Sequence, residues 1–192
     1  VMVSVSVIIP AYNEEKAIGM QLERIQRVMA ASGYSFETIL VDDGSSDATA
    51  EIASAYGVRV IRHRRQRGSG AARRTGIINA RGDIVVMTDG DCSYPVEAIP
   101  HLLAHFPGAD QVVGARMREA GTMPWLRVPT KWFIRQLASL LTGARIPDLN
   151  SGLRAFKRDI MLKYLYLVPD GFSCVTTMTL AFLVNGYVVE YV

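Results

Sequence analysis

The order of hydrophobic and polar positions along the chain predicts strands and helices that alternate. Short apolar runs that end in polar or glycine-containing turns predict buried strands. A further apolar run at the end of the chain also has the pattern of a strand. The expected strands lie at residues 4–9, 38–41, 58–61, 84–88, around 112–113, 153–157 and within 187–192.

Helices are expected between most of these strands. Ile18, Leu22, Ile25 and Met29 recur at helical spacing after the first strand, and Gly33 predicts the end of that helix. Alternating strands and helices predict an α/β fold with a mostly parallel central sheet that helices flank on both faces. The other expected helices run from Ser46 and Asp47 to Gly57, from Gly68 to Ala80, through Ile99 to Phe106, and in two stretches after residue 157.

Composition favours one folded domain. Of the 192 residues, 49% are hydrophobic and 20% are charged, which provides a sizeable core and argues against disorder. The net charge of +3 is too small to imply a nucleic-acid partner. Cys92 and Cys174 form neither a disulfide framework nor a metal-ligand pattern. We find no signal-peptide pattern and no apolar run as long as a spanning helix, and we expect residues 1–192 to be one domain of a protein that continues beyond Val192.

Two carboxylates stand one residue apart in Asp89-Gly90-Asp91, directly after the fourth expected strand. In an open α/β sheet, ligands bind at the carboxyl ends of the strands. Two acids crowded at that edge repel each other unless a cation lies between them. A hard divalent cation, Mg²⁺ or Mn²⁺, suits oxygen ligands and usually binds together with phosphates. The alternative is a solvated polar turn.

Polar side chains also follow the first two strands. Tyr12 can stack on a base and Glu14 can accept a hydrogen bond from a base or a ribose hydroxyl, or both can belong to a polar turn before a helix. Asp43 can accept from a nucleobase N–H or a ribose hydroxyl, or can cap the next helix. The residues by themselves leave these interpretations open.

The run from His63 to Arg74 is strongly basic. It lacks the interleaved aromatic residues of a nucleic-acid surface, and it lacks the third glycine and the position after the first strand of a dinucleotide fingerprint. Two interpretations remain. The run can be a flexible loop that leads into a helix N-terminus near an anionic substrate, or a solvated basic face.

Taken together, these motifs resemble the family 2 glycosyltransferases of the GT-A fold. The resemblance covers nearly the whole chain and implies a Rossmann-like GT-A domain. The segment from Asp148 to Phe156 is similar to the branch that includes dolichyl-phosphate mannose synthase and bacterial polyprenyl-phosphate glycosyltransferases. The residues that carry the resemblance are Pro10 to Glu14, Val41 to Ser45, Gly68 to Gly76, Ala80 to Asp83, and Asp89 to Asp91.

The resemblance implies a nucleotide-sugar donor, GDP- or UDP-linked, a divalent metal, Mg²⁺ or Mn²⁺, and a polyprenyl-phosphate acceptor at the cytoplasmic face of a membrane. The reaction would invert the anomeric centre. Asp91 and Ser93 would hold the metal, although the mannose synthases carry a glutamine where this chain has Ser93. The donor-binding residues would be Pro10, Tyr12, Glu14, Val41, Asp43, Asp89, Gly90, Asp91 and Arg116.

Asp89, Asp91 and Asp148 are the candidate catalytic residues. Asp148 can act as a base, as a partner of a sugar hydroxyl or as a loop anchor, or can form an Asp-turn with its own backbone. A lipid phosphate is already an anion and needs no general base, and few carboxylates follow Glu119 in the chain. That scarcity favours a phosphate acceptor over an alcohol.

Residues 123–145 combine arginine, lysine, tryptophan and phenylalanine without an acid, which is typical of a segment at an anionic membrane surface. The alternative is a helix that packs on the sheet with its charges solvated. Other functions to weigh are transfer to a soluble or saccharide acceptor and a non-catalytic nucleotide-binding or membrane-surface module. The candidate contacts to an acceptor phosphate are Arg127, Lys131, Arg135 and Arg154.

Overall fold

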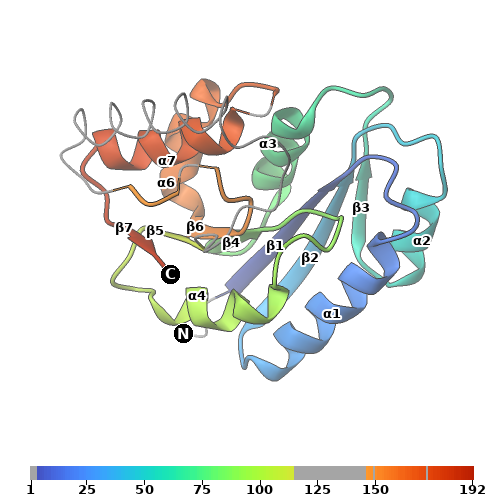
Figure 1. The fold of residues 1–192 in the computed structure, drawn as a ribbon, viewed down its shortest axis with the longest axis horizontal. Coiled ribbons are helices and arrows are strands. Elements are labelled where there is room, and N and C mark those ends of the chain that lie inside the picture. Colours follow the sequence, from blue (N-terminus) through green and yellow to red (C-terminus); the bar gives the residue numbers. More distant parts are fainter. Residues whose placement is uncertain (1–3, 115–145, 149, 172) are drawn as a thin grey trace, which may run out of the picture.

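The computed structural model describes residues 4–114, 146–148, 150–171 and 173–192 (Figure 1). Its centre is a seven-stranded sheet with the strand order β3-β2-β1-β4-β6-β5-β7. The strands are β1 (Ser4–Ala11), β2 (Ser35–Asp42), β3 (Arg59–Arg62), β4 (Ile84–Met87), β5 (Gln111–Val113), β6 (Arg154–Lys157) and β7 (Val189–Tyr191).

Most neighbouring strands are parallel. β1 pairs in parallel with β2 and β4, β2 with β3, and β5 with β7. β6 lies between β4 and β5 and runs antiparallel to both. The mostly parallel sheet expected from the sequence is therefore confirmed, and β6 is the reversed strand that simple strand–helix alternation does not anticipate.

Helices cover both faces of the sheet (Figure 1). One face packs on α1, α2 and α4 with the 3-10 turn η1, and the other packs on α3, α6 and α7. The predicted flanking helices are therefore present on both sides. Their bounds are α1 (Ile18–Ala31), α2 (Thr49–Ala55), α3 (Ser69–Asn79), η1 (Val96–Ala98), α4 (Ile99–Ala104), α6 (Arg158–Tyr164), η2 (Leu165–Leu167) and α7 (Cys174–Val184).

Alternation along β1 divides the core into two layers. Val5, Val7 and Ile9 pack with α1 and α4, whereas Ile8 packs with α3 on the opposite face. Successive side chains of a strand point to opposite faces, so an apolar strand such as β1 supplies both layers. Each large apolar side chain that is fully buried here stabilises the fold by about 1.5–3 kcal/mol.

Gly76 brings α3 close to the sheet. A Cβ atom at Gly76 would lie 2.3 Å from Cγ2 of Ile8, so a larger residue would force Ile8 or α3 to shift. Close packing of α3 on β1 fixes where the first turn of α3 lies relative to the carboxyl ends of β1 and β4. That placement matters for the site, because the first two turns of α3 carry Ser69 and Arg73.

Candidate active site

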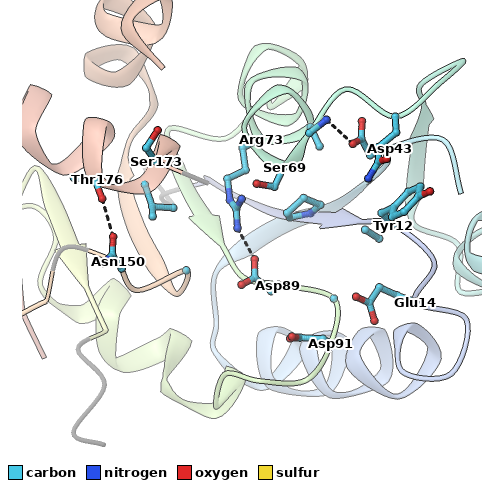
Figure 2. Close-up of a pocket in the computed structure, with 18 residues that line it drawn as sticks. Tyr12, Glu14, Asp43, Ser69, Arg73, Asp89, Asp91, Asn150, Ser173 and Thr176 are labelled. Atoms are coloured by element: carbon cyan, nitrogen blue, oxygen red, sulfur yellow. Dashed lines mark hydrogen bonds and ion pairs between the residues drawn. The ribbon is translucent and has the colours of Figure 1, made fainter. Parts of the chain in front are cut away.

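A cavity of about 850 Å³ opens at the carboxyl ends of β1, β2 and β4 (Figure 2). These strands are parallel, so the loops that follow them meet at one edge of the sheet, as expected for an open α/β fold. The C-terminal part of the described chain supplies the opposite wall. The lining residues are Pro10, Ala11, Tyr12, Glu14, Asp43, Gln66, Gly68, Ser69, Ala72, Arg73, Asp89, Gly90, Asp91, Asn150, Gly152, Ser173, Val175 and Thr176.

The loop after β1 presents Tyr12 and Glu14 to the cavity. Asn13 adopts a positive φ of 56°, and its backbone N–H donates to Ser45 Oγ at 2.9 Å. Glu14 N–H donates to Thr49 Oγ1 at 2.8 Å. These bonds tie the loop after β1 to the loop after β2. The two hydrogen bonds therefore fix the orientation of the exposed Tyr12 ring and of the half-buried Glu14 carboxyl.

Asp43 anchors the basic loop. Its carboxylate accepts the backbone N–H of Arg67 at 3.0 Å and of Gly68 at 2.8 Å, and it lies 2.7 Å from Nδ1 of His63. The other ring nitrogen of His63 lies 2.9 Å from Thr75 Oγ1. Asp43 is therefore buried at the cavity wall, and it holds the loop that leads into α3.

Sequence reasoning did not assign a role to His63. The signal available was a histidine at the end of the third expected strand, and nothing in the sequence pairs it with Asp43. The exposed side chains of Arg64, Arg65 and Arg67 agree with the interpretation of a solvated basic face. The loop also leads into a helix N-terminus at the cavity through Gln66 and Gly68, so both interpretations describe part of it.

Arg73 from α3 forms an ion pair with Asp89 at the centre of the cavity (Figure 2). Arg73 Nη2 lies 2.5 Å from Asp89 Oδ1, and only 8% of the Arg73 side chain is exposed. The backbone carbonyl of Asp89 accepts from Gln21 Nε2 at 2.9 Å. The sequence placed Asp89 at the site but missed Arg73, whose only signal was its position in the glycine-rich motif from Gly68 to Gly76.

Asp91 is exposed, and its Oδ1 accepts the backbone N–H of Ser93 at 2.9 Å. Burial raises the pKa of Glu14, and the negative charges of Asp91, Asp47 and Asp89 raise it further. The cavity thus gathers carboxylates that repel one another. The side chain of Ser93 is not part of the cavity lining, so its predicted role at a metal stays a prediction.

The donor atoms at this edge suit a hard divalent cation that a substrate helps to bind. Mg²⁺ is usually held by one or two carboxylates together with substrate phosphates, not by a complete cage of protein ligands. Among the described residues, no group of three or more histidine, cysteine or carboxylate side chains is arranged to hold a metal ion. Asp91, with its exposed carboxylate and the nearby charges of Glu14 and Asp89, fits such an ion.

The opposite wall comes from the loop before β6 and from the start of α7. Thr176 Oγ1 donates to Asn150 Oδ1 at 2.7 Å (Figure 2). Asn150 N–H donates to Asp148 Oδ1 at 2.8 Å, which is the contact of an Asp-turn. The loop approaches the centre closely, because a Cβ atom at Gly152 would lie 2.7 Å from Oδ2 of Asp89. Asp148 therefore anchors this loop, and its part in a reaction stays a prediction.

Two predicted binding residues do not line the cavity. Arg154 is fully buried, and its guanidinium donates to the carbonyls of Ser151 and Val175 and to Thr179 Oγ1. Burial, together with the charge of Arg73, lowers the pKa of Arg154 to about 10. The expected contact of Arg154 with an acceptor phosphate is corrected, because this guanidinium is enclosed by protein. The side chain of Val41 is also buried, in the layer that packs on α3.

The remaining basic candidates lie outside the described residues. They are Arg116, Arg127, Lys131 and Arg135, and the expected amphipathic segment 123–145 lies outside as well. Within the described ranges, no helix is both long and apolar enough to cross a membrane.

A mostly parallel sheet, with carboxylates after β4 and a cavity across the strand ends, is the architecture of a GT-A glycosyltransferase. The fold agrees with two solved structures. Glucosyl-3-phosphoglycerate synthase from Mycobacterium tuberculosis superposes with a TM-score of 0.76 at 24% identity, over 98% of this chain and 69% of that one. Mannosyl-3-phosphoglycerate synthase from Rubrobacter xylanophilus gives a TM-score of 0.77 at 19% identity, over 98% and 64% of the two chains.

The family model for glycosyl transferase family 2 matches residues 6–165, and the chain belongs to that family. It is 34% identical over 163 residues to an undecaprenyl-phosphate 4-deoxy-4-formamido-L-arabinose transferase from Pseudomonas aeruginosa, covering 82% of this chain and 48% of the relative. It is 38% identical over 158 residues to a dolichyl-phosphate hexose transferase from Haloferax volcanii, covering 81% and 67%.

A dodecaprenyl-phosphate galacturonate synthase from Rhizobium johnstonii is 30% identical over 164 residues, covering 81% of this chain and 48% of the relative. The chain thus spans about half the length of two of these three curated relatives.

Proposed function

We propose that this chain is the catalytic domain of an enzyme that transfers a sugar from a GDP- or UDP-linked donor to a polyprenyl phosphate, with inversion at the anomeric carbon. One observation carries the proposal. The cavity at the strand ends joins an exposed aromatic ring, Tyr12, to a cluster of carboxylates around Asp89 and Asp91. The three relatives are named for transfer to polyprenyl or dolichyl phosphates, which supports the acceptor class.

The donor would lie across the cavity with its base at Tyr12. Pro10 and Tyr12 would bound the base, and Glu14 would accept from the base or ribose. Asp43 already binds the loop before α3, so it would act mainly by holding that loop against the nucleoside, with a remaining lone pair for a donor N–H. Val41 would contribute through its backbone, because its side chain is buried. Arg116 would add a cation beside the phosphates.

Asp91 would bind Mg²⁺ or Mn²⁺ together with the donor diphosphate. A bound divalent ion would stabilise the charge that develops on the leaving nucleoside diphosphate as a Lewis acid. A GT-A neighbour, glucosyl-3-phosphoglycerate synthase, was crystallised with Mn²⁺ and UDP-glucose, which supports a divalent ion beside the donor. Asp89 would face the sugar, and Arg73 would hold its carboxylate in place and neutralise its charge.

The acceptor would attack without a general base, because a phosphate oxygen is already negatively charged at neutral pH. Among the described lining residues the carboxylates are Glu14, Asp43, Asp89 and Asp91, all on the donor side and centre of the cavity. Arg127, Lys131 and Arg135 would draw the lipid phosphate in from the cytoplasmic face of the membrane. Direct displacement from the face opposite the diphosphate would invert the anomeric carbon.

The experiment is a transfer assay with the full-length natural protein. A panel of GDP- and UDP-sugars is incubated with Mn²⁺ or EDTA, and with either detergent-solubilised polyprenyl phosphate or simple sugar acceptors. We expect a sugar-phospholipid product only with metal and with polyprenyl phosphate. Transfer to sugars alone would instead support a soluble or saccharide acceptor. Donor binding without any transfer would support a non-catalytic module.

A further inference from the structure

The two ends of the cavity differ in charge. Glu14 and Asp43 lie at the end that carries Tyr12, and Arg73 with Asp89 lies at the centre (Figure 2). The opposite end carries uncharged polar groups from Asn150, Ser173 and Thr176. Arg73 is the single cation among the described lining residues, and its guanidinium is engaged by Asp89.

In the Asn150–Thr176 pair, the threonine hydroxyl is the donor and the amide oxygen is the acceptor. Thr176 Oγ1 donates to Asn150 Oδ1 at 2.7 Å, so the oxygen of the amide is engaged by protein. Within the described ranges Asn150 forms hydrogen bonds through its backbone N–H and its Oδ1, and the amide Nδ2 keeps two N–H donors for a ligand. The Asp-turn between Asp148 and the Asn150 backbone holds the residue in this position. The pair therefore offers oriented, uncharged donors at the rim of the cavity.

The pair also lies beyond Asp89 as seen from Tyr12 (Figure 2). Gly152 permits this approach, because any larger residue would place a Cβ atom 2.7 Å from Asp89 Oδ2. In a nucleotide sugar the units follow in the order base, ribose, diphosphate and sugar. With the base at Tyr12 and the diphosphate near Asp91, the sugar would lie beyond the diphosphate, on the side of Asn150 and Thr176.

We propose that Asn150 and Thr176 determine sugar specificity by binding hydroxyl groups of the transferred sugar, and that they select an uncharged sugar over one that carries a carboxylate. The inference rests on the proposed function. Uncharged amide and hydroxyl groups match sugar hydroxyls in donor and acceptor character. A uronate at this end would meet no free cation among the described lining residues, because the guanidinium of Arg73 is already paired with Asp89.

The test measures donor binding and transfer separately in the full-length protein. Titration calorimetry measures the dissociation constant of the nucleoside diphosphate and that of its hexose derivative. The first divided by the second is the binding ratio, which isolates the contribution of the sugar to affinity. We expect Asn150→Ala and Thr176→Val to lower that ratio by about tenfold, as loss of an ordinary hydrogen bond predicts, with affinity for the nucleoside diphosphate unchanged. Thr177→Val is the matched control, because the Thr177 hydroxyl donates to Ser173 O within its own helix and does not line the cavity.

A monodeoxy donor series identifies the contacted hydroxyl. The donor that lacks this hydroxyl should bind wild type about tenfold more weakly and should lose nothing further in Asn150→Ala, because the same bond is absent in both. Wild type should also prefer a hexose donor over the matching uronate.

Several results would overturn the inference. One is an unchanged binding ratio in both variants. Another is a preference of wild type for the uronate. A third is a raised KM for polyprenyl phosphate with unchanged sugar binding, which would assign the pair to the acceptor. Because the binding ratio needs no turnover, absence of transfer to polyprenyl phosphate would refute the proposed function while a shifted ratio still supported the sugar contact.

Discussion

Replacing Arg73 by methionine tests the central electrostatic feature of the cavity. The variant keeps a long side chain on α3 but leaves the Asp89 carboxylate without its cation. The Arg73 side chain is 8% exposed and that of Asp89 is 30% exposed, with 2.5 Å between Nη2 and Oδ1. Removal of one partner from a fully buried ion pair costs about 3–5 kcal/mol. Because water reaches Asp89 in part, we expect a loss of about 2–3 kcal/mol in the free energy of unfolding.

The neighbouring arginine supplies the control. Arg74 also pairs with a carboxylate, that of Asp170, but their side chains are 28% and 56% exposed. Exposed ion pairs are worth about 0–1 kcal/mol, so Arg74→Met should be clearly milder. Urea denaturation in EDTA measures both variants against wild type. Equal losses for Arg73→Met and Arg74→Met would refute the argument that burial at Asp89 sets the magnitude.

Three further predictions concern the metal, the packing of α3 and the acids of the cavity. Asp91→Asn should abolish the Mn²⁺-dependent rise in melting temperature that the donor nucleotide gives, and a shift that persists would remove Asp91 from the metal site. Gly76→Ala should destabilise by about 1–3 kcal/mol, because its Cβ would meet Ile8 at 2.3 Å. Gly171→Ala, with no atom within 4 Å of the added Cβ, should change the unfolding free energy little. The raised pKa of Glu14 means that the folded state binds its proton more tightly than the unfolded state. The stability that this proton contributes is present below the pKa of Glu14 in the unfolded state and is lost as pH rises through its pKa in the folded state. Without metal, Glu14→Gln should therefore have a higher melting temperature than wild type at pH 7 and a similar one below about pH 4.

Much of the fold followed from local patterns. Apolar runs located β1, β2 and β4 because these strands are buried on both faces and their apolar character is continuous. The direction of β6 did not follow, because a pattern of apolar residues is the same in either direction. Only the pairing of β6 between β4 and β5 decides that it runs antiparallel to both.

The candidate site was partly visible for a similar reason. Asp89, Asp91, Glu14 and Tyr12 directly follow strands, so their sequence positions placed them at the edge of the sheet where ligands bind. Arg73 had no such marker, since its partner Asp89 lies 16 residues away and the two meet only when α3 packs on β1. The pairing of Asn150 with Thr176, 26 residues apart, was hidden in the same way.

The sequence by itself determined the alternation of strands and helices, the family resemblance and the acids at the strand ends. These features depend on short-range periodicity and on residues that stand next to one another. Tertiary structure alone decided which polar groups face the cavity and which form their hydrogen bonds within the protein. Arg154 illustrates the difference. Its charge suggested a phosphate contact, but the fold buries the side chain fully, and its guanidinium donates to two backbone carbonyls and a threonine hydroxyl. Burial and partner choice are properties of long-range packing, which one residue and its neighbours in sequence do not fix.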